Sequence, residues 1–367
     1  MGPAEASEAR GPTPWSFSLM VGEAIDGAIL AFMNTASAHP RAGDLDRLAV
    51  EISGAHRLYR ERGLLGRPDV FHRLPPPLFS PRVGGEGFWP FDYRWLSFPS
   101  GYDPDPTDPA TSRWSQYQPN HTAHAWVLRH PHSTADWLIC LHGMGAGHPA
   151  LDFPGFRART LQQMGLNLLF PVLPLHGPRR VPGKGVRAFL SFDLLDALHG
   201  FTQAVSEVRR LIRWARGEGA KRVGLYGLSL GAYTAALVAT LEEVDLLIAG
   251  IPVSDLPDLF LWHAPPQLRA EVAARDLFGP ELRDLFALVS PLGRPPLLPR
   301  ERRFIFAGLG DRMAPAVQAR RLWEHWERPS IAWYAGGHVS FFWTSEVQAF
   351  VRGALMESGF LSPPGAS

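Results

Sequence analysis

Short apolar runs alternate with amphipathic runs through most of the chain, and this alternation is typical of a sheet covered by helices on both faces. Eight segments have the apolar or alternating pattern of strands. They span residues 89–98, 123–128, 137–141, 165–173, 222–226, 244–251, 304–307 and 331–334. Helical patterns lie between the middle strands, chiefly over 189–216. We therefore predict an α/β fold with a mainly parallel eight-stranded sheet.

Two helices are expected before the sheet, over residues 17–33 and from residue 44 to about residue 62. The first is the most apolar stretch of the chain, but it contains Glu23 and Asp26, and each acid near the centre of a membrane span costs about 2.5–3.5 kcal/mol. We predict an amphipathic helix that packs on the core, with a lid or membrane-surface role as the alternative. Its apolar positions at helical spacing are Phe17, Met20, Val21, Ile25, Ala28 and Phe32.

The domain organisation is predicted from Pro- and Gly-rich segments and from the lengths of the connections between strands. Residues 63–87 are rich in Pro and Gly and predict an extended connector. We therefore expect an N-terminal helical extension with this connector (1–84), a main domain (85–360) and a flexible tail (361–367). Residues 254–300, between the sixth and seventh strands, are too long for a connector and predict an inserted cap. The Leu, Phe and Trp side chains of the cap either bury it against the sheet or contact an acyl chain.

Composition excludes several classes of protein. The formal charge of +1 argues against nucleic-acid binding, and the dominance of arginine over lysine, with much Ala, Gly and Pro, is typical of a GC-rich bacterial genome. Cys140 is the single cysteine and lies in a predicted core strand, so we expect a reducing, cytoplasmic compartment. The N-terminus carries Glu5 and Glu8 and lacks the pattern of a signal peptide, and no transmembrane segment is expected.

One motif joins a predicted strand to a predicted helix: Gly227-Leu228-Ser229-Leu230-Gly231. A serine at such a turn is forced into a strained backbone conformation that leaves its hydroxyl protruding. Small residues two positions before and after it let the strand and the helix approach each other closely. The motif therefore predicts that Ser229 is a nucleophile.

A nucleophilic serine needs a base, an acid that orients the base, and donors for the oxyanion. His338, Asp311 and the loop His142-Gly143-Met144-Gly145 each follow a predicted strand. Because ligands of open α/β sheets bind at the carboxyl edge of the strands, we expect these groups to meet there. Asp255, which follows the sixth strand, is the alternative acid.

Together these features resemble the α/β-hydrolase superfamily over roughly residues 85–360. The resemblance implies that Ser229 is the nucleophile, His338 the general base and Asp311 the orienting acid, with the backbone N–H groups of Leu230 and Met144 as the oxyanion hole. It implies a serine hydrolase that cleaves a carboxylic ester or thioester of a small molecule and uses no cofactor. An acyltransferase or a peptidase has the same triad, and a non-catalytic scaffold that binds a ligand or partner is the competing class.

Further polar residues lie near the predicted edge. Arg179, Arg180, Lys184 and Arg187 follow the fourth strand, where they either form a solvated loop or, through Arg179 and Arg180, bind a carboxylate or phosphate of the substrate. We expect His142 to hold its own loop by hydrogen bonding. Histidines at 121, 124, 130 and 132 have no Asp, Glu or Cys beside them, so no metal site is expected.

Overall fold

The computed structural model describes residues 17–35, 40, 42–78, 80–88, 91–131, 136–184, 189, 191 and 193–361. Within these ranges, one sheet has the strand order β1-β2-β3-β5-β4-β6-β7-β8-β9. The strands are β1 (Arg82–Phe88), β2 (Phe91–Pro99), β3 (Thr122–Leu128), β4 (Asp136–Leu141), β5 (Asn167–Val172), β6 (Arg222–Leu228), β7 (Leu246–Gly250), β8 (Arg303–Gly308) and β9 (Ser330–Tyr334). All eight predicted strands are present.

The sheet is mixed, and its parallel part carries the predicted edge. Antiparallel pairing joins β1 to β2, β2 to β3 and β3 to β5. All neighbouring pairs from β5 through β4, β6, β7 and β8 to β9 are parallel. The unpredicted ninth strand, β1, occupies the end of the segment expected to be a connector and extends one residue beyond it. Its glycines explain the error: a Cβ on Gly84 would lie 2.2 Å from the Trp95 ring of β2, so the paired strand requires a glycine there.

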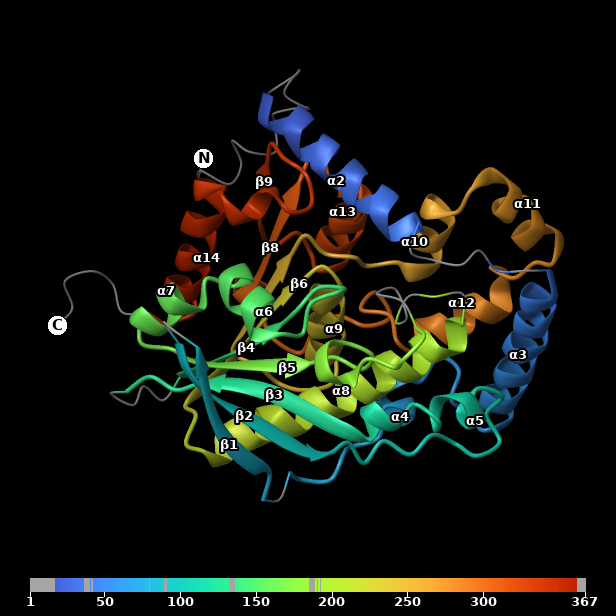
Figure 1. Ribbon diagram of the computed structural model, residues 1–367, viewed down its shortest axis with the longest axis horizontal. Coiled ribbons are helices and arrows are strands. Elements are labelled where there is room, and N and C mark those ends of the chain that lie inside the picture. The colour runs from blue at the N-terminus through green and yellow to red at the C-terminus, as the bar shows by residue number, and fades with distance from the viewer. Residues whose placement is uncertain are drawn as a thin grey trace.

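The described helices cover both faces of the sheet (Figure 1). They are α2 (Phe17–Thr35), α3 (Ala42–Glu61), α4 (Pro68–Phe71), α5 (Thr111–Trp114), α6 (Pro149–Gly155), α7 (Ala158–Gln163), α8 (Leu194–Gly217), α9 (Leu230–Ala239), α10 (Leu256–His263), α11 (Pro266–Ala274), α12 (Pro280–Ala287), α13 (Ala316–His325) and α14 (Ser345–Glu357). Helices α3, α8 and α9 contribute to one hydrophobic core and α6, α7 and α14 to the other. Alternate residues of the central strands face the two cores; in β7, Leu247 points to the first and Ile248 to the second.

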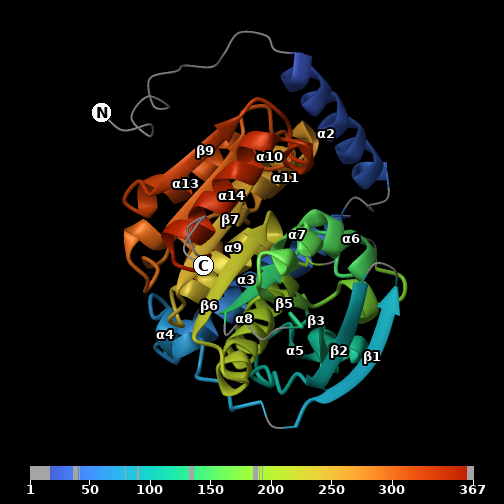
Figure 2. The ribbon, with the colours of Figure 1, turned by 90° about the vertical axis from the view of Figure 1, so that its left-hand side faces the viewer.

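Helix α2 forms where it was predicted, but it packs through a different face. Met20 and Val21, expected in the core, are 48% and 37% exposed, whereas Gly22 and Asp26 are buried. The side chains of Phe17 and Phe32 lie outside the described residues. The prediction of the packing face was wrong because α2 packs against the backbone of two loops (Figure 2). At such a contact, a glycine that allows close approach and a carboxylate that accepts from backbone N–H groups matter more than apolar area.

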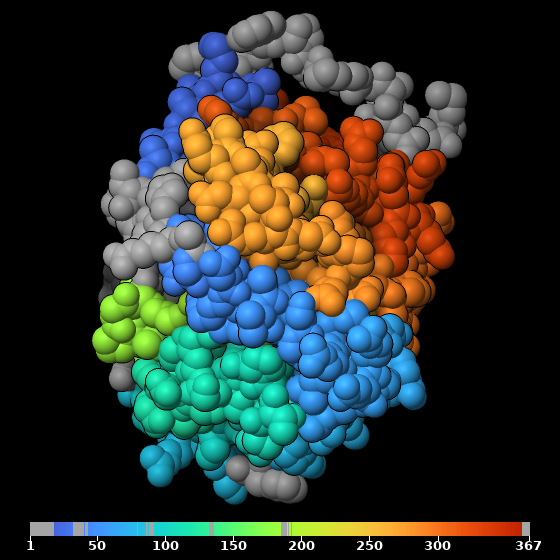
Figure 3. Space-filling view, turned by 90° about the vertical axis from the view of Figure 1, so that its right-hand side faces the viewer, coloured from blue at the N-terminus to red at the C-terminus, as the bar shows by residue number. Residues whose placement is uncertain are grey.

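The segment predicted to be a cap carries α10, α11 and α12. Figure 3 shows it (orange) on one face of the molecule, beside α3, and α12 contacts α3. Hydrogen bonds from Ser53 to Glu281 and between His56 and Asp284 join these two helices. No helix in the described part of the chain is both long and apolar enough to cross a membrane. Residues 362–367 of the predicted tail lie outside the described residues.

Candidate active site

Ser229 occupies the turn between β6 and α9 in the predicted strained conformation. Its φ is 54° and its ψ −115°, which a residue with a side chain rarely adopts, and its N–H donates to Gly250 O at 2.9 Å. The flanking glycines are required by close packing. A Cβ on Gly231 would lie 1.9 Å from Leu141 O, and one on Gly227 would lie 2.3 Å from Gly231 O. The tight turn therefore places the partly exposed Ser229 at the carboxyl edge of β6.

Two further candidate residues, Asp311 and His338, form a buried hydrogen-bonded pair. His338 Nδ1 lies 2.6 Å from Asp311 Oδ2, while Asp311 Oδ1 accepts hydrogen bonds from the backbone N–H groups of Met313 (2.9 Å) and Ala314 (2.7 Å). Burial disfavours the imidazolium, but the charge and hydrogen bond of Asp311, together with the charge of Asp26, outweigh it, so the pKa of His338 is raised above its ordinary value. The fixed carboxylate therefore holds a proton on Nδ1 and leaves Nε2 as the basic nitrogen.

The loop after β4 lies beside the serine, since a Cβ on Gly143 would be 3.5 Å from Ser229 Cβ. His142 holds this loop as expected: it accepts a hydrogen bond from Leu173 N–H at Nε2 (3.1 Å) and lies 2.7 Å from Gly143 O through Nδ1. Burial lowers the pKa of His142 to about 4, so its ring is neutral at pH 7. The loop is anchored at its far end by Asp152, whose Oδ1 accepts a hydrogen bond from Gly147 N–H.

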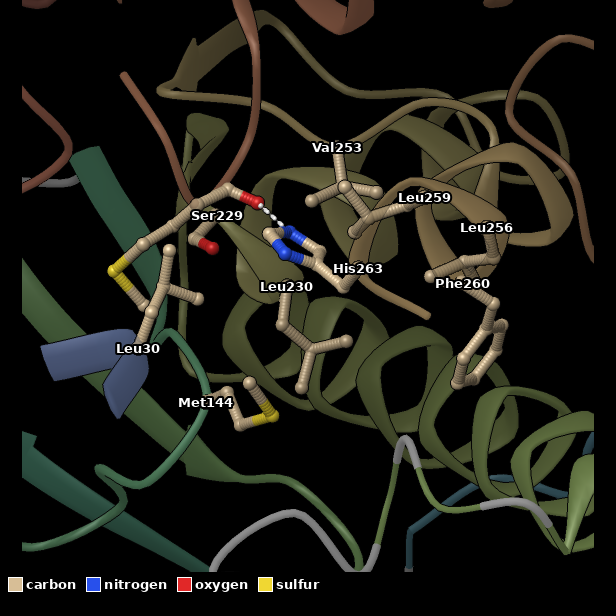
Figure 4. Close-up of a pocket in the computed structure, with 10 residues that line it drawn as sticks. Leu30, Met144, Ser229, Leu230, Val253, Leu256, Leu259, Phe260 and His263 are labelled. Carbon is tan, nitrogen blue, oxygen red and sulfur yellow. Dashed lines mark hydrogen bonds between the residues drawn. The ribbon is translucent and has the colours of Figure 1, made fainter. Parts of the chain in front are cut away.

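A pocket with largely apolar walls opens onto Ser229 (Figure 4). It is lined by Leu30, Met144, Ser229, Leu230, Val253, Leu256, Leu259, Phe260, His263 and Met313. Leu30 comes from α2, Met144 from the loop after β4, and the residues from Leu256 onward to His263 from α10. Helices α2 and α10 therefore both contribute walls to the space above the serine.

Comparison with known proteins supports this architecture. Two uncharacterized proteins of Mycobacterium tuberculosis, MT2702 and Rv2627c, are 41% and 40% identical to the chain over 331 residues, which span 87% of this chain and 77% of each relative. The chain belongs to their family. No family model matches it. Among solved structures, an acetyl xylan esterase from Paenibacillus sp. R4 superposes with a TM-score of 0.54 at 13% identity, covering 82% of this chain and 94% of the esterase. This member of their family thus has the α/β-hydrolase fold.

The alternative acid of this family member, Asp255, lies in a different environment. Its Oδ1 accepts a hydrogen bond from Asp258 N–H at 3.0 Å, which caps the N-terminus of α10, and its Oδ2 lies 3.4 Å from Arg321. His338 is bonded to Asp311 instead. The geometry therefore favours Asp311 over Asp255 as the partner of the histidine.

Arg179 of the basic loop fits neither of the two predicted arrangements, a solvated loop or substrate binding. The guanidinium of Arg179 is fully buried and donates to both carboxylate oxygens of Glu207 (2.6 and 2.8 Å), to Val172 O and to Asn120 O. It is not available to a substrate, so the predicted role of Arg179 in substrate binding was wrong. Such a pair satisfies a buried charge and holds the loop from inside.

The other basic residues of this loop differ in exposure and in their partners. Arg180 is exposed and donates to Gly145 O at 3.2 Å, in the loop after β4. Lys184 pairs with Asp193 at 3.0 Å, and Arg187 lies outside the described residues. Among the residues that the structure describes, no three His, Cys, Asp or Glu side chains are grouped closely enough to hold a metal ion.

Several residues of the site were not predicted from the sequence, among them His263 and Leu30, and neither was the role of Asp26. His263, at the end of α10, lines the pocket, and its Nε2 lies 2.9 Å from Met313 O; because a carbonyl only accepts, Nε2 carries the proton. Leu30 also lines the pocket, and it lies in α2, the helix for which a lid role was one of the predicted alternatives. Asp26 was noted only as a charge in that helix, yet its carboxylate contacts the backbone of His338.

Proposed function

We propose that this protein is a serine hydrolase that cleaves a carboxylic ester or thioester through an acyl-enzyme on Ser229. The observation that carries the proposal is the combination of a serine in a strained turn with a buried Asp311–His338 pair at the same edge of one sheet. Strain of this kind costs on the order of 1–3 kcal/mol and is concentrated at functional sites. A scaffold that only binds a ligand has no use for it.

The proposed chemistry assigns one task to each group. Ser229 Oγ attacks the acyl carbonyl, and His338 Nε2 accepts its proton and later delivers it to the leaving group. Asp311 keeps the other imidazole proton on Nδ1 and stabilises the imidazolium. The N–H of Leu230, in the first turn of α9 where N–H groups have no intrahelical acceptor, and that of Met144 stabilise the oxyanion. Water then resolves the acyl-enzyme.

The walls of the pocket indicate the kind of acyl group. Apart from Ser229 and His263, the lining side chains are Leu, Met, Val and Phe, and these favour an uncharged apolar group on the acyl side. The exposed Arg180 lies at the loop after β4, outside this lining. We therefore propose a neutral acyl chain as the preferred substrate part.

A fluorophosphonate probe tests the nucleophile directly, because it reacts covalently with activated serines. We expect one labelled site in the wild-type protein, located at Ser229 by mass spectrometry, and no labelling of Ser229→Ala. Hydrolysis of p-nitrophenyl esters should fall by several orders of magnitude in Ser229→Ala, with circular dichroism unchanged. Ser206→Ala, on α8 and away from the pocket, is the matched control and should retain full activity.

Two results would contradict the proposal. If the wild-type protein is not labelled while a known serine hydrolase beside it is, the chain is a binding scaffold. If Ser229→Ala keeps more than a tenth of the wild-type turnover, Ser229 is not the nucleophile. A series of nitrophenyl esters of increasing acyl length then reports the depth of the pocket, and comparison of water with amine or alcohol acceptors separates hydrolysis from acyl transfer.

A further inference from the structure

Helix α2 rests directly on the loops that carry the acid and the base. A Cβ on Gly22 would lie 2.2 Å from Gly337 N, and a Cβ on Gly337 would lie 2.5 Å from Gly22 O, so the two backbones touch only because both residues are glycines. A Cβ on Gly310, one residue before Asp311, would lie 2.6 Å from Leu19 of the same helix. The buried face of α2 is therefore complementary to the loops after β8 and β9.

Asp26 is the polar centre of this contact. Its side chain is fully buried, and Oδ2 accepts hydrogen bonds from the backbone N–H of His338 at 2.7 Å and from that of Arg312 at 3.0 Å. One oxygen thus joins the loop after β9 to the loop after β8. The other, Oδ1, is buried and has no hydrogen-bond partner among the described residues. Leaving one oxygen unpartnered is costly, so packing alone does not account for an aspartate here.

We propose that Asp26 is a positioning residue of the active site, contributed by the N-terminal helix, that fixes the backbone of His338 against that of Arg312, the residue after Asp311, and supplies a second negative charge to the imidazole. The proposal rests on the proposed function, since it assumes that His338 is the base. The Asp311 carboxylate orients the ring through Nδ1, and the Asp26 carboxylate orients the main chain of the same residue. Both ends of the histidine are therefore held by carboxylates.

Several charged and polar groups surround Asp26 and His338. Asp26 and Asp311 both stabilise the imidazolium of His338 and raise its pKa against the effect of burial. Burial raises the pKa of Asp26 itself, and the N–H groups of His338 and Arg312 oppose that rise. The Tyr334 hydroxyl donates to Gly337 O. Glu23 of α2 lies against Gly310, and the Arg312 guanidinium lies against Gly27 of α2. Removal of the Asp26 charge should therefore lower the pKa of His338.

Three variants separate the charge of Asp26 from its hydrogen bonds. Asp26→Asn keeps an oxygen that can accept from both N–H groups and removes the charge, whereas Asp26→Ala removes both. Glu23→Gln is the matched control, because it removes a carboxylate from the same helix at a half-buried position. For each protein, the rate of fluorophosphonate labelling at Ser229 is measured from pH 5 to 9. The titration of the His338 ring is followed by NMR and assigned by comparison with His338→Gln, and thermal unfolding is recorded.

We expect Asp26→Ala to slow labelling about ten- to hundredfold at all pH values, because a small displacement of a catalytic base has effects of that size. Asp26→Asn should retain most of the maximal rate, while the midpoints of both the labelling profile and the NMR titration move about 0.5 to 1 pH unit lower. Glu23→Gln should match the wild type in all three measurements. A purely structural role would lower thermal stability and leave both midpoints unchanged.

The outcomes distinguish this inference from the proposed function. If the wild-type protein is not labelled, the proposed function fails and the inference fails with it. If the wild type is labelled but Asp26→Ala and Asp26→Asn have its rate and its His338 midpoint, the inference alone is overturned. Equal midpoint shifts in Glu23→Gln and Asp26→Asn would also overturn it, since the effect would then be one of net charge on α2.

Discussion

Replacement of Asp311 by asparagine tests the proposed orienting acid with almost no change in shape. Asp311 Oδ1 accepts two backbone hydrogen bonds, from Met313 and Ala314, and Oδ2 faces His338 Nδ1. In Asp311→Asn the amide oxygen should keep the position that faces the two backbone donors, because the amide NH₂ cannot accept from them. The NH₂ group then points at His338 Nδ1 and donates to it.

The magnitude follows from the tautomer that this arrangement imposes. When Nδ1 accepts a hydrogen bond, the imidazole proton resides on Nε2, and a protonated Nε2 cannot take the proton of Ser229. In trypsin the same replacement lowers kcat by about four orders of magnitude, which corresponds to about 5 kcal/mol in the activation barrier. We expect a loss of this size in kcat/KM. The free energy of unfolding should change little, because both backbone hydrogen bonds are kept.

Asp255→Asn is the matched control for the assay. Asparagine caps a helix as well as aspartate does, so α10 should keep its N-terminal hydrogen bond to Asp258 N–H. The lost ion pair with the partly exposed Arg321 is worth about 0–1 kcal/mol. The two variants are compared by kcat/KM for one nitrophenyl ester and by urea unfolding. The reasoning is refuted if Asp311→Asn keeps more than a tenth of wild-type kcat/KM, or if Asp255→Asn is the more damaging change.

Three further predictions concern pH and the charged residues near the site. Because the pKa of His338 is raised and the base must be neutral, kcat/KM should rise with pH through an apparent pKa above 6.5 and then level off; a flat profile from pH 5 to 9 would exclude this base. Burial raises the pKa of Asp152 to about 7, so the folded state holds a proton that the unfolded state loses near pH 4, and stability should fall by up to about 4 kcal/mol as the pH rises from 4 to 7. Urea unfolding should show that this fall is absent in Asp152→Asn, and a wild-type curve without it would contradict the assignment. Arg179→Ala leaves Glu207 buried and should cost about 3–5 kcal/mol in urea unfolding, whereas Arg180→Ala should leave stability unchanged and raise KM only for esters that carry an anionic group; equal destabilisation by the two variants would refute the distinction.

The sequence predicted correctly those parts of the fold for which residue chemistry and hydrophobic periodicity indicate the same structure. Each of the eight predicted strands combines an apolar run with flanking turn residues, and the parallel order of β4, β6, β7, β8 and β9 follows from the helices between them. The motif around Ser229 was interpretable because its glycines are required by the packing of α9 against β6 and β4. The carboxyl-edge rule then brought Asp311 and His338 together, although 27 positions separate them in the chain.

Where a residue type serves two purposes equally well, sequence could not decide. Arginine is the best residue for binding a carboxylate, whether that carboxylate belongs to a substrate or to a buried side chain of the same protein. Arg179 and Arg180 are adjacent in the chain, yet one is enclosed with Glu207 and the other is exposed. The identity of the partner depends on Glu207 of α8, which lies 28 positions away, and no local pattern identifies it.

The same limit explains why the packing face of α2 was predicted wrongly, and α2 contributes to the support of the candidate site. Periodicity ranks the faces of a helix by apolar area, so it gave the buried face to Met20 and Val21 and used Asp26 only as a charge that argues against a membrane span. In the structure the helix docks on the backbone of two loops, and backbone N–H groups are satisfied by a carboxylate and not by an apolar side chain. Since the loops that α2 contacts carry Asp311 and His338, the N-terminal segment, which sequence analysis treated as an extension outside the main domain, completes the support of the candidate site.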